Sequence, residues 1–550
     1  MPINRLLLFT AFLALLPPVH SNAIPADAEA RSVPPRLFYT DLLDGPASGG
    51  EDHQGAFVTL YGIGFGEVRG NSTVTLDNRE VYAYRYWSNN KIVIQLGQKA
   101  QSGGIRVHVS DMPGTNALPF TVRSGHIYFV ATQGKDINPG GFMKPWRTLV
   151  EAKNHLAPGD ILYAMNGVRQ DTLDKYDSAL SIQTSGTPEK PIAIVAYPGA
   201  TVTIGSTSGP SISARTPNID RKSDHWVLAG LTFVGSQEAL DVTASSHWRV
   251  VGNDFSCPRG FGPTGCIEFG QAEEIAFLGN TVHDIAQPHT TKQYHAVYFT
   301  TDSNHIDFGW NTIANVRSCR ALEFHSSPLD PGTGHNQFDI HIHNNRIHDV
   351  VCDAINLATI DPSQGTIEID NNLIYNVGTG PDPDDGSADY ACVYVQGGAN
   401  AGQPGSGTVE VYNNTFYNCG SRSNTDSGAL ALSEGSPKQF VSLRNNIIVL
   451  PGGTPLLSPN STRSPLKLGR NLCWPASNCQ RPRLDTQSNL IIRNPLFRSP
   501  PDGDFGLQPG SPAIGAATGD IPSADIFGIS RKSDGHADLG AIEHDGGLNH

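Results

Sequence analysis

The sequence predicts an all-β protein in which a small β-sandwich precedes a long parallel β-helix. A four-residue strand pattern recurs seven times between residues 239 and 432, with apolar residues at its second and fourth positions. A second short strand follows each time and ends in an asparagine, and successive asparagines are 27 to 42 residues apart. Repeats of this length are typical of solenoids and propellers. No ten-residue helical pattern separates the strands, so a βαβ arrangement is not indicated.

Alternation along each strand predicts which side chains meet. Side chains of a strand point to opposite faces in turn, so the second and fourth positions should face the core and the first and third should face outward. Asparagine tolerates left-handed backbone and therefore fits a sharp turn. A propeller would need about four regular strands per repeat, which makes the β-helix the favoured interpretation. The repeats begin at Ala239, Cys266, Ala296, Ala321, Ala354, Cys392 and Ala429, and their asparagines are Asn253, Asn280, Asn311, Asn345, Asn372, Asn414 and Asn446.

Composition and the N-terminus predict an exported protein. The 550 residues carry a net charge of −14, which argues against a nucleic-acid partner. Arg5, the eleven-residue apolar run Leu6–Leu16 and the small residues around Ala23 are typical of a secretory signal over residues 1–23. The run is too short for a membrane span, and no later stretch could form one. We therefore expect a protein that is secreted, periplasmic or on the cell surface, and monomeric.

Eight cysteines fit an oxidising compartment. Cys319 and Cys352 occupy the same position in consecutive repeats, so stacking should bring them within bridging distance. The spacing suggests Cys257 with Cys266, Cys392 with Cys419, and Cys473 with Cys479 as the other pairs, although eight cysteines allow 105 pairings.

Residues 33–124 contain short alternating strands with turn residues between them, as in a β-sandwich. Gly49-Gly50 and the stretch Thr59–Gly66, which reads TLYGIGFG, resemble the immunoglobulin-like IPT/TIG domain. The resemblance implies a spacer or a surface for carbohydrate or protein contact.

Residues 126–545 carry a second resemblance. The segment opens with Ile127–Val130, a helical pattern over Pro145–Leu156 that could cover the open end of a solenoid, and a strand at Ile161–Tyr163. It closes with Asn494–Phe497 and Asp538–Ala541. These segments resemble secreted right-handed parallel β-helix proteins of the pectate-lyase-like superfamily, and right-handed crossovers are the general preference. The fold hosts lyases, hydrolases, epimerases and adhesins, so it does not define the reaction.

The outward third positions predict a working surface over adjacent coils. Acids, aromatic rings, histidine and arginine gather there, which suits an extracellular polysaccharide as the bound partner. The column reads Asp241, Glu268, Tyr298, Glu323, Asn356 and Tyr394, and the column two residues on reads Thr243, Gly270, Thr300, His325, Ala358 and Gln396.

The reaction we predict from this surface is β-elimination from a uronic-acid polysaccharide. Elimination needs a base, a positive group for the substrate carboxylate and an acid for the leaving oxygen. Parallel β-helix lyases combine Lys or Arg with calcium, although this chain lacks their close Glu-x-Glu pattern. The catalytic candidates are Lys292, His295, Tyr298, Arg320, Glu323 and His325, and the substrate-binding candidates are Glu268, Asp353, Asn356, Tyr394 and Gln396.

Three alternatives stay open. Glu268 and Glu323 lie two coils, about 9.6 Å, apart, and with Asp353 nearby they could serve an inverting glycoside hydrolase. A C5-epimerase would use the elimination residues and return the proton from the other face. A surface adhesin would need no such gathering of ionisable groups.

A possible Ca²⁺ site precedes the Tyr394 strand, where four carboxylates fall within eight residues of a glycine-containing loop. His341 and His343 alternate on one strand, and we expect them in side-chain ladders rather than in a transition-metal site. The predicted calcium ligands are Asp382, Asp384, Asp385 and Asp389.

Overall fold

The structure is a computed structural model, and it describes residues 34–174, 176–208, 212–213, 223–286, 291–326, 337–386, 388–396, 407–422, 427–432, 439–461, 466–479, 489–532 and 535–544. The predicted signal segment, residues 1–23, lies outside these ranges. No helix within them has both the length and the apolar character that a membrane crossing needs.

The N-terminal strands form a two-sheet β-sandwich, as predicted. Alternate residues of both sheets, such as Val58, Leu60 and Ile105, fill a shared apolar core. One sheet contains β1 (Arg36–Thr40), β3 (Phe57–Ile63), β7 (Lys91–Gln95) and β6 (Ala83–Trp87). The other contains β2 (Asp44–Gly45), β9 (Leu118–Val122), β8 (Gly103–His108), β4 (Thr73–Leu76) and β5 (Arg79–Glu80), and a short 3-10 helix, η2, spans Glu51–His53.

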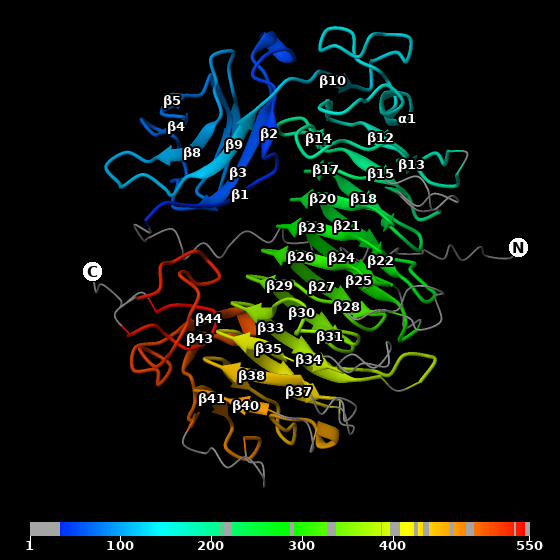
Figure 1. Ribbon diagram of the computed structural model, residues 1–550. Helices are drawn as coiled ribbons and strands as arrows, with labels where there is room; N and C mark the ends of the chain where they lie inside the picture. The colour runs from blue at the N-terminus through cyan, green and yellow to red at the C-terminus, as the bar shows by residue number, and fades with distance from the viewer. Residues whose placement is uncertain are drawn as a thin grey trace, which may run out of the picture. The chain divides into compact units, whose positions relative to one another are not determined.

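Three long parallel sheets follow, and they form the predicted right-handed parallel β-helix (Figure 1). Most coils add one strand to each sheet. The first sheet consists of β10 (Ile127–Val130), β11 (Ile161–Ala164), β14 (Ile192–Ala196), β17 (Trp226–Ala229), β20 (Ser246–Val251), β23 (Glu273–Leu278), β26 (Asn304–Gly309), β29 (Ile340–His343), β32 (Ile367–Asp370), β35 (Gly407–Tyr412), β38 (Gln439–Arg444) and β40 (Leu466–Leu468).

The second sheet consists of β12 (Arg169–Gln170), β15 (Thr203–Gly205), β18 (Thr232–Val234), β21 (Asp254–Cys257), β24 (Thr281–Ile285), β27 (Thr312–Val316), β30 (Arg346–Val350), β33 (Leu373–Val377), β36 (Thr415–Cys419), β39 (Ile447–Val449), β41 (Asn471–Trp474) and β42 (Leu490–Ile492). The third sheet consists of β13 (Leu180–Ser181), β16 (Ile212–Ser213), β19 (Leu240–Thr243), β22 (Gly265–Gly270), β25 (His295–Thr300), β28 (Leu322–His325), β31 (Ile355–Leu357), β34 (Tyr390–Val395) and β37 (Ser427–Leu432).

The repeat pattern correctly predicts which side chains fill the interior of the coils, with one exception. Its second and fourth positions, such as Val297 and Phe299, are buried in the core as predicted. The first position was predicted to face outward, and that was wrong, because its small Ala and Cys residues are also buried in the core cluster. A small side chain at the corner where the chain enters the third sheet leaves room for the coils to stack.

A buried asparagine ladder runs between the first and second sheets. Each Asn side chain accepts from the backbone N–H of the preceding rung, as between Asn280 and Asn253 (3.0 Å), and donates to a strand carbonyl. Left-handed backbone was predicted at the asparagine itself, but it falls one residue earlier, for example at Gly252 and Asn344. The ladder rungs are Asn253, Asn280, Asn311, Asn345, Asn372, Asn414, Asn446 and an eighth, Asn471, that the pattern did not include.

A short helix covers the first coil, although it is shorter than predicted. Helix α1 spans Leu149–Lys153, and the Thr148 hydroxyl accepts from the Glu151 N–H as an N-cap. The predicted start at Pro145 was wrong, because Trp146 instead forms a parallel bridge to Val130 of β10. Trp146 and Leu149 join the core of the coils.

The sandwich packs on the outer face of the first sheet. Apolar residues of early coils, including Val227 and Leu278, belong to the same buried cluster as the sandwich core. Tyr163 of β11 donates its hydroxyl hydrogen to the Phe57 carbonyl and accepts from the Phe57 N–H, both at 2.8 Å. Gly279 is required where the sandwich packs on the coils, because a Cβ at this position would lie 1.8 Å from the Tyr39 hydroxyl.

The last part of the chain packs against the second sheet. Strands β43 (Phe497–Ser499) and β44 (Asp504–Leu507) form an antiparallel pair joined by the 3-10 helix η5 (Pro500–Asp502), and a further 3-10 helix, η3, spans Pro459–Ser461. Phe505 and Leu539 share an apolar cluster with Leu373 and Ile447 of the second sheet. The four predicted disulfides are present, Cys257–Cys266, Cys319–Cys352, Cys392–Cys419 and Cys473–Cys479.

Candidate active site on the third sheet

The predicted columns stack on the outer side of the third sheet in the expected register. Glu268 pairs with Tyr298, and Tyr298 pairs with Glu323 on the next strand. Asn356 and Tyr394 continue the line on β31 and β34. The structure therefore brings these candidates together on adjacent strands.

This column differs from a solvated face because several of its polar side chains are buried. Glu323 is 4% exposed and Asn356 is fully buried, while Glu268, Tyr298 and Tyr394 are half-buried. Burying polar groups costs free energy unless hydrogen bonds or ion pairs compensate for it. The arrangement of partners around these residues thus decides what the site can do.

Arg320 lies at the centre of a buried charge cluster just before β28. Its guanidinium lies 3.3 Å from both Glu323 Oε2 and Asp353 Oδ2, and 3.0 Å from Asp389 Oδ2. It also donates to the Lys292 carbonyl at 3.3 Å. Asp353 is fully buried and accepts from the Ala391 N–H at 2.7 Å. One arginine thus joins side chains from three strands and their preceding loops.

Burial shifts the protonation of this cluster. Loss of hydration raises the pKa of Glu323 to about 7, against the opposing effect of Arg320 and with a further rise from Asp389. Burial and the neighbouring Asp389 also raise the pKa of Asp353 well above its ordinary value. Burial disfavours the charge of Arg320, but the three carboxylates outweigh it and hold its pKa above the ordinary range. The arginine is therefore permanently charged, and Glu323 is poised to exchange a proton near neutrality.

Tyr298 and His325 form a hydrogen-bonded pair beside this cluster, with the Tyr298 hydroxyl 3.3 Å from His325 Nδ1. Burial, followed by Glu323 and Glu268, raises the pKa of Tyr298, so its phenol keeps its proton near neutrality. His295, whose ring centroid lies 5.0 Å from that of Tyr298, is 4% exposed. Burial, Arg320 and His325 lower its pKa well below the ordinary value, so its imidazole is neutral.

Amide groups continue the column beyond Glu323. Asn356 Nδ2 is buried and has no hydrogen-bond partner within the described residues. Asn356 Oδ1 lies 3.5 Å from Gln396 Nε2, and Tyr394 pairs with Asn356 on the neighbouring strand. A buried N–H donor without a partner favours an acceptor oxygen from a ligand.

Glu268 occupies the other end of the column. The Thr264 hydroxyl donates to Glu268 Oε2 and lies 3.0 Å from Glu238 Oε1, so a hydroxyl connects two carboxylates. Thr264 was not among the predicted residues. It lies two positions before its strand pattern, where other repeats carry residues as different as Gln237, Cys319 and Tyr390, so the sequence offered no signal for it.

The predicted calcium loop distributes its carboxylates among different partners. Asp382 pairs with Arg422 at 2.7 Å and accepts from the Tyr390 hydroxyl. Asp385 accepts from the Lys292 N–H at 2.9 Å and from the Thr291 hydroxyl, and Asp389 belongs to the Arg320 cluster. Among the described residues, no three of the acids Asp382, Asp384, Asp385 and Asp389 form a group with metal-ligand spacing.

The chain is similar to known proteins only in part. No protein-family model matches the chain. A curated relative, the uncharacterized protein YwoF of Bacillus subtilis strain 168, is 31% identical over 140 residues, and the match spans 24% of this chain and only 28% of that relative.

Solved structures with similar coils have low identity. A pectate lyase, Pel9A, is 15% identical with a TM-score of 0.46 and covers 77% of this chain and 97% of its own. A rhamnogalacturonan lyase is 14% identical with a TM-score of 0.39 and covers 76% and 96%. A lacto-N-biosidase from Eubacterium ramulus is 12% identical with a TM-score of 0.35 and covers 63% and 67%.

Proposed function

We propose that the protein is a carbohydrate-active enzyme that binds a uronic-acid polysaccharide along the third sheet and cleaves it by β-elimination. The observation that carries the proposal is the Tyr298–His325 pair, with its 3.3 Å contact, next to the buried amide of Asn356. The pair offers a proton donor and a proton acceptor, and the amide offers a donor for a substrate carboxylate.

In the proposed reaction, His325 removes the proton at C5, next to the substrate carboxylate. The C4–C5 double bond forms as the C4–O bond breaks, and the leaving glycosidic oxygen takes the proton of Tyr298. Burial favours the protonated phenol, which suits Tyr298 as the acid. The hydrogen bond between the two side chains then lets the proton held by His325 return to Tyr298.

The carboxylate of the sugar would lie against Asn356 Nδ2 and Gln396, with Tyr394 stacking beside them. Arg320 already faces three protein carboxylates, so we assign it to positioning Glu323 and Asp353 rather than to substrate charge. Lys292 stays a candidate base because two hydrogen bonds hold its backbone in place. Its N–H donates to Asp385, and its carbonyl accepts from Arg320.

The test is incubation with a panel of uronic-acid polymers while the ultraviolet absorbance of the unsaturated product is followed. A rise that disappears in Tyr298→Phe supports elimination through this pair. Chelator is added in a parallel series, because calcium at Asp384 and its neighbours is also a proposal. No rise with any uronic polymer, together with new reducing ends, would refute elimination.

A second candidate is glycoside hydrolysis, favoured by the raised pKa of Glu323, about 7. A carboxyl group that keeps its proton near neutrality can act as a general acid. Glu268, two strands away and about 9.6 Å distant along the sheet, could activate water, since inverting enzymes separate their carboxyl groups by roughly 6.5–9.5 Å. Reducing ends without unsaturated sugar, lost in both Glu323→Gln and Glu268→Gln, would establish this reaction.

We also propose that the protein works outside the cytosol as a monomer. Four disulfides among the described residues fit an oxidising compartment. Fractionation of cells that express the full chain, combined with light scattering on the exported product, tests both statements.

A further inference from the structure

A second cluster of ionisable side chains lies on the outer face of the first sheet, on a different sheet from the proposed active site. Asp307, His341 and Glu368 stack in register on β26, β29 and β32. His343 and Asp370 stack beside them, two residues further along. Two histidines and three carboxylates from three adjacent strands therefore share one surface.

The ligand atoms form two groups that share His341, and the atoms of each group lie close enough together to hold an ion. Asp307, His341 and His343 have their ligand atoms within 4.8 Å of one another, and so do His341, Glu368 and Asp370. His341 belongs to both groups. His341 Nε2 lies 2.6 Å from Asp370 Oδ1, and His343 Nε2 lies 2.8 Å from Asp307 Oδ1.

The orientation of His343 is fixed in a way that suits a cation. Asn344 Nδ2 donates to the Asp525 carbonyl at 3.2 Å, which leaves Asn344 Oδ1 to accept from His343 Nδ1 at 3.0 Å. His343 Nδ1 therefore carries a hydrogen. A neutral ring would then turn a bare Nε2 toward the Asp307 carboxylate, so the 2.8 Å contact requires either a second proton or a cation.

The two imidazole rings are stacked with their centroids 4.2 Å apart. If a proton filled each nitrogen–carboxylate contact, His343 would become positive because its Nδ1 already carries a hydrogen, whereas His341 could donate from Nε2 as a neutral ring. With both rings neutral, the three carboxylates contribute a charge of −3, which Arg249 near Asp307 offsets only in part. A divalent cation shared by these groups would offset that charge without charging the rings.

The rear of the cluster is rigid and buried. His343 is 7% exposed and Asp370 is 4% exposed. The His343 ring packs edge-on against Trp310 with centroids 4.5 Å apart. Gly309 gives it room, because a Cβ there would come within 2.5 Å of the ring. Such support from neighbouring side chains is what orients histidine ligands at metal sites.

We propose that His341, His343, Asp307, Asp370 and Glu368 form a site for a divalent transition-metal ion of the zinc type. Imidazole nitrogen with carboxylate oxygen favours zinc and its neighbours, whereas calcium and magnesium prefer oxygen ligands alone. This site is separate from the proposed elimination reaction and does not depend on it. It replaces the expectation that His341 and His343 serve only in side-chain ladders.

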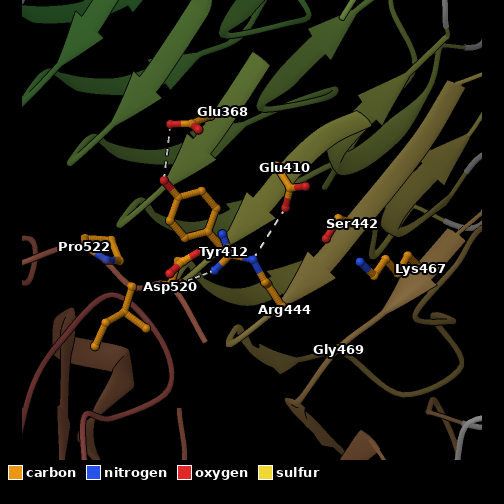
Figure 2. A pocket seen from close by; sticks show the side chains of 10 residues that line it. Glu368, Glu410, Tyr412, Ser442, Arg444, Lys467, Gly469, Asp520 and Pro522 are labelled. Carbon is orange, nitrogen blue, oxygen red and sulfur yellow. Dashed lines mark hydrogen bonds and ion pairs between the residues drawn. The ribbon is translucent and has the colours of Figure 1, made fainter. Parts of the chain in front are cut away.

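The metal site would open onto a cavity of about 490 Å³, to which Glu368 also contributes (Figure 2). Glu368 Oε2 accepts from the Tyr412 hydroxyl at 3.3 Å. Arg444 covers the Tyr412 ring at 4.0 Å and pairs with Glu410 at 3.5 Å. An ion held by His341 and Glu368 would thus lie beside this cavity.

The test is equilibrium dialysis of the chelator-treated full chain against ZnCl₂, followed by elemental analysis. We expect one zinc per chain and loss of binding in His341→Ala, the ligand shared by both groups. The matched control is His283→Ala, because His283 lies between Asp254 and Asp284, at 3.2 and 2.9 Å, on the second sheet but outside either metal group. Asn344→Gly should weaken binding by roughly 10–100-fold, as expected for a residue that only orients a ligand.

Circular dichroism of each variant separates a lost site from a lost fold. Zinc binding that is retained in His341→Ala, or absent from the unaltered chain, would overturn the proposal. Displacement of zinc by an equal concentration of CaCl₂ would also contradict it, since the ligand set then would not discriminate by nitrogen donors. Cobalt(II) provides a second readout, because its visible absorption should appear with the unaltered chain and be missing with His341→Ala.

Discussion

The early coils carry apolar side chains on the outer face of the first sheet and ionisable side chains on the outer face of the third sheet. On β17, β20 and β23 of the first sheet, the outward residues include Val227, Val251 and Leu278, and the sandwich packs on them. On β22, β25 and β28 of the third sheet, the outward residues are Glu268, Tyr298 and Glu323. The interior of both sheets is equally apolar. The outward residues, rather than the coil, therefore determine whether a face holds a packed domain or a cluster of ionisable side chains.

The two faces also differ in how burial is stabilised. On the first sheet, removal of apolar area from water stabilises the contact by roughly 25 cal/mol per Å². On the third sheet, buried charges depend on their partners, and loss of one partner leaves the others without compensation. Substitutions should therefore affect activity on one face and docking on the other.

The largest expected effect is on activity. Tyr298→Phe removes the hydroxyl that contacts His325, and proton transfer by a positioned side chain contributes roughly 10²–10⁴-fold to rate. We expect a loss of this size in turnover with an almost unchanged melting temperature. Tyr394→Phe, on the same column, is the control and should lose far less. An equal loss in both variants would remove the special role of Tyr298.

Arg320→Ala should give the largest loss of stability. It leaves Glu323, Asp353 and Asp389 without their shared cation, and breaking a buried ion pair costs about 3–5 kcal/mol. Chemical denaturation measures the change. Arg422→Ala is the control, because Arg422 pairs with Asp382 on the surface, where ion pairs contribute little to stability. Similar losses in both would show that the Arg320 cluster is solvated.

Glu323 should make stability depend on pH. Its pKa is about 7 in the folded protein and about 4.5 as an ordinary glutamate, so the folded state holds the extra proton between these values. Stability should therefore fall as pH rises from about 4.5 to about 7, by an amount on the order of 3 kcal/mol. The measurement is the difference in unfolding free energy between the unaltered chain and Glu323→Gln across this range. A difference that stays constant with pH would contradict the raised pKa.

The smallest effect is expected at the docked sandwich. Tyr163→Phe removes a hydroxyl that pairs with both backbone groups of Phe57, and buried groups left unpaired cost about 1–3 kcal/mol. Denaturation should detect this loss while turnover stays unchanged. Reduced turnover in Tyr163→Phe would mean that docking of the sandwich influences the third sheet.

Features that recur in every repeat could be predicted from the sequence. Contacts between segments far apart in the chain could not. Period-two alternation placed Glu268, Tyr298 and Glu323 on one line, and the same stacking placed Cys319 beside Cys352. The sequence could not show that Asp389 would pair with Arg320, because the two residues lie 69 positions apart in the chain.

The docking of the sandwich escaped prediction for a similar reason. Glycines such as Gly279 look like ordinary turn residues in the sequence, and only the structure shows the Tyr39 hydroxyl above them. The start of α1 was misplaced because Pro145 was taken as its first residue, whereas Trp146 pairs with β10. A local sequence pattern does not show that a residue pairs with a distant strand instead of joining a helix.

The asparagine ladder has a consequence for how this chain can change. Its rungs keep the same hydrogen bonds although 25 residues separate Asn446 from Asn471 and 42 separate Asn372 from Asn414. Insertions can therefore lengthen one circuit without altering how neighbouring circuits align. The corner that holds the ladder therefore keeps the coils aligned where the loops between them differ in length.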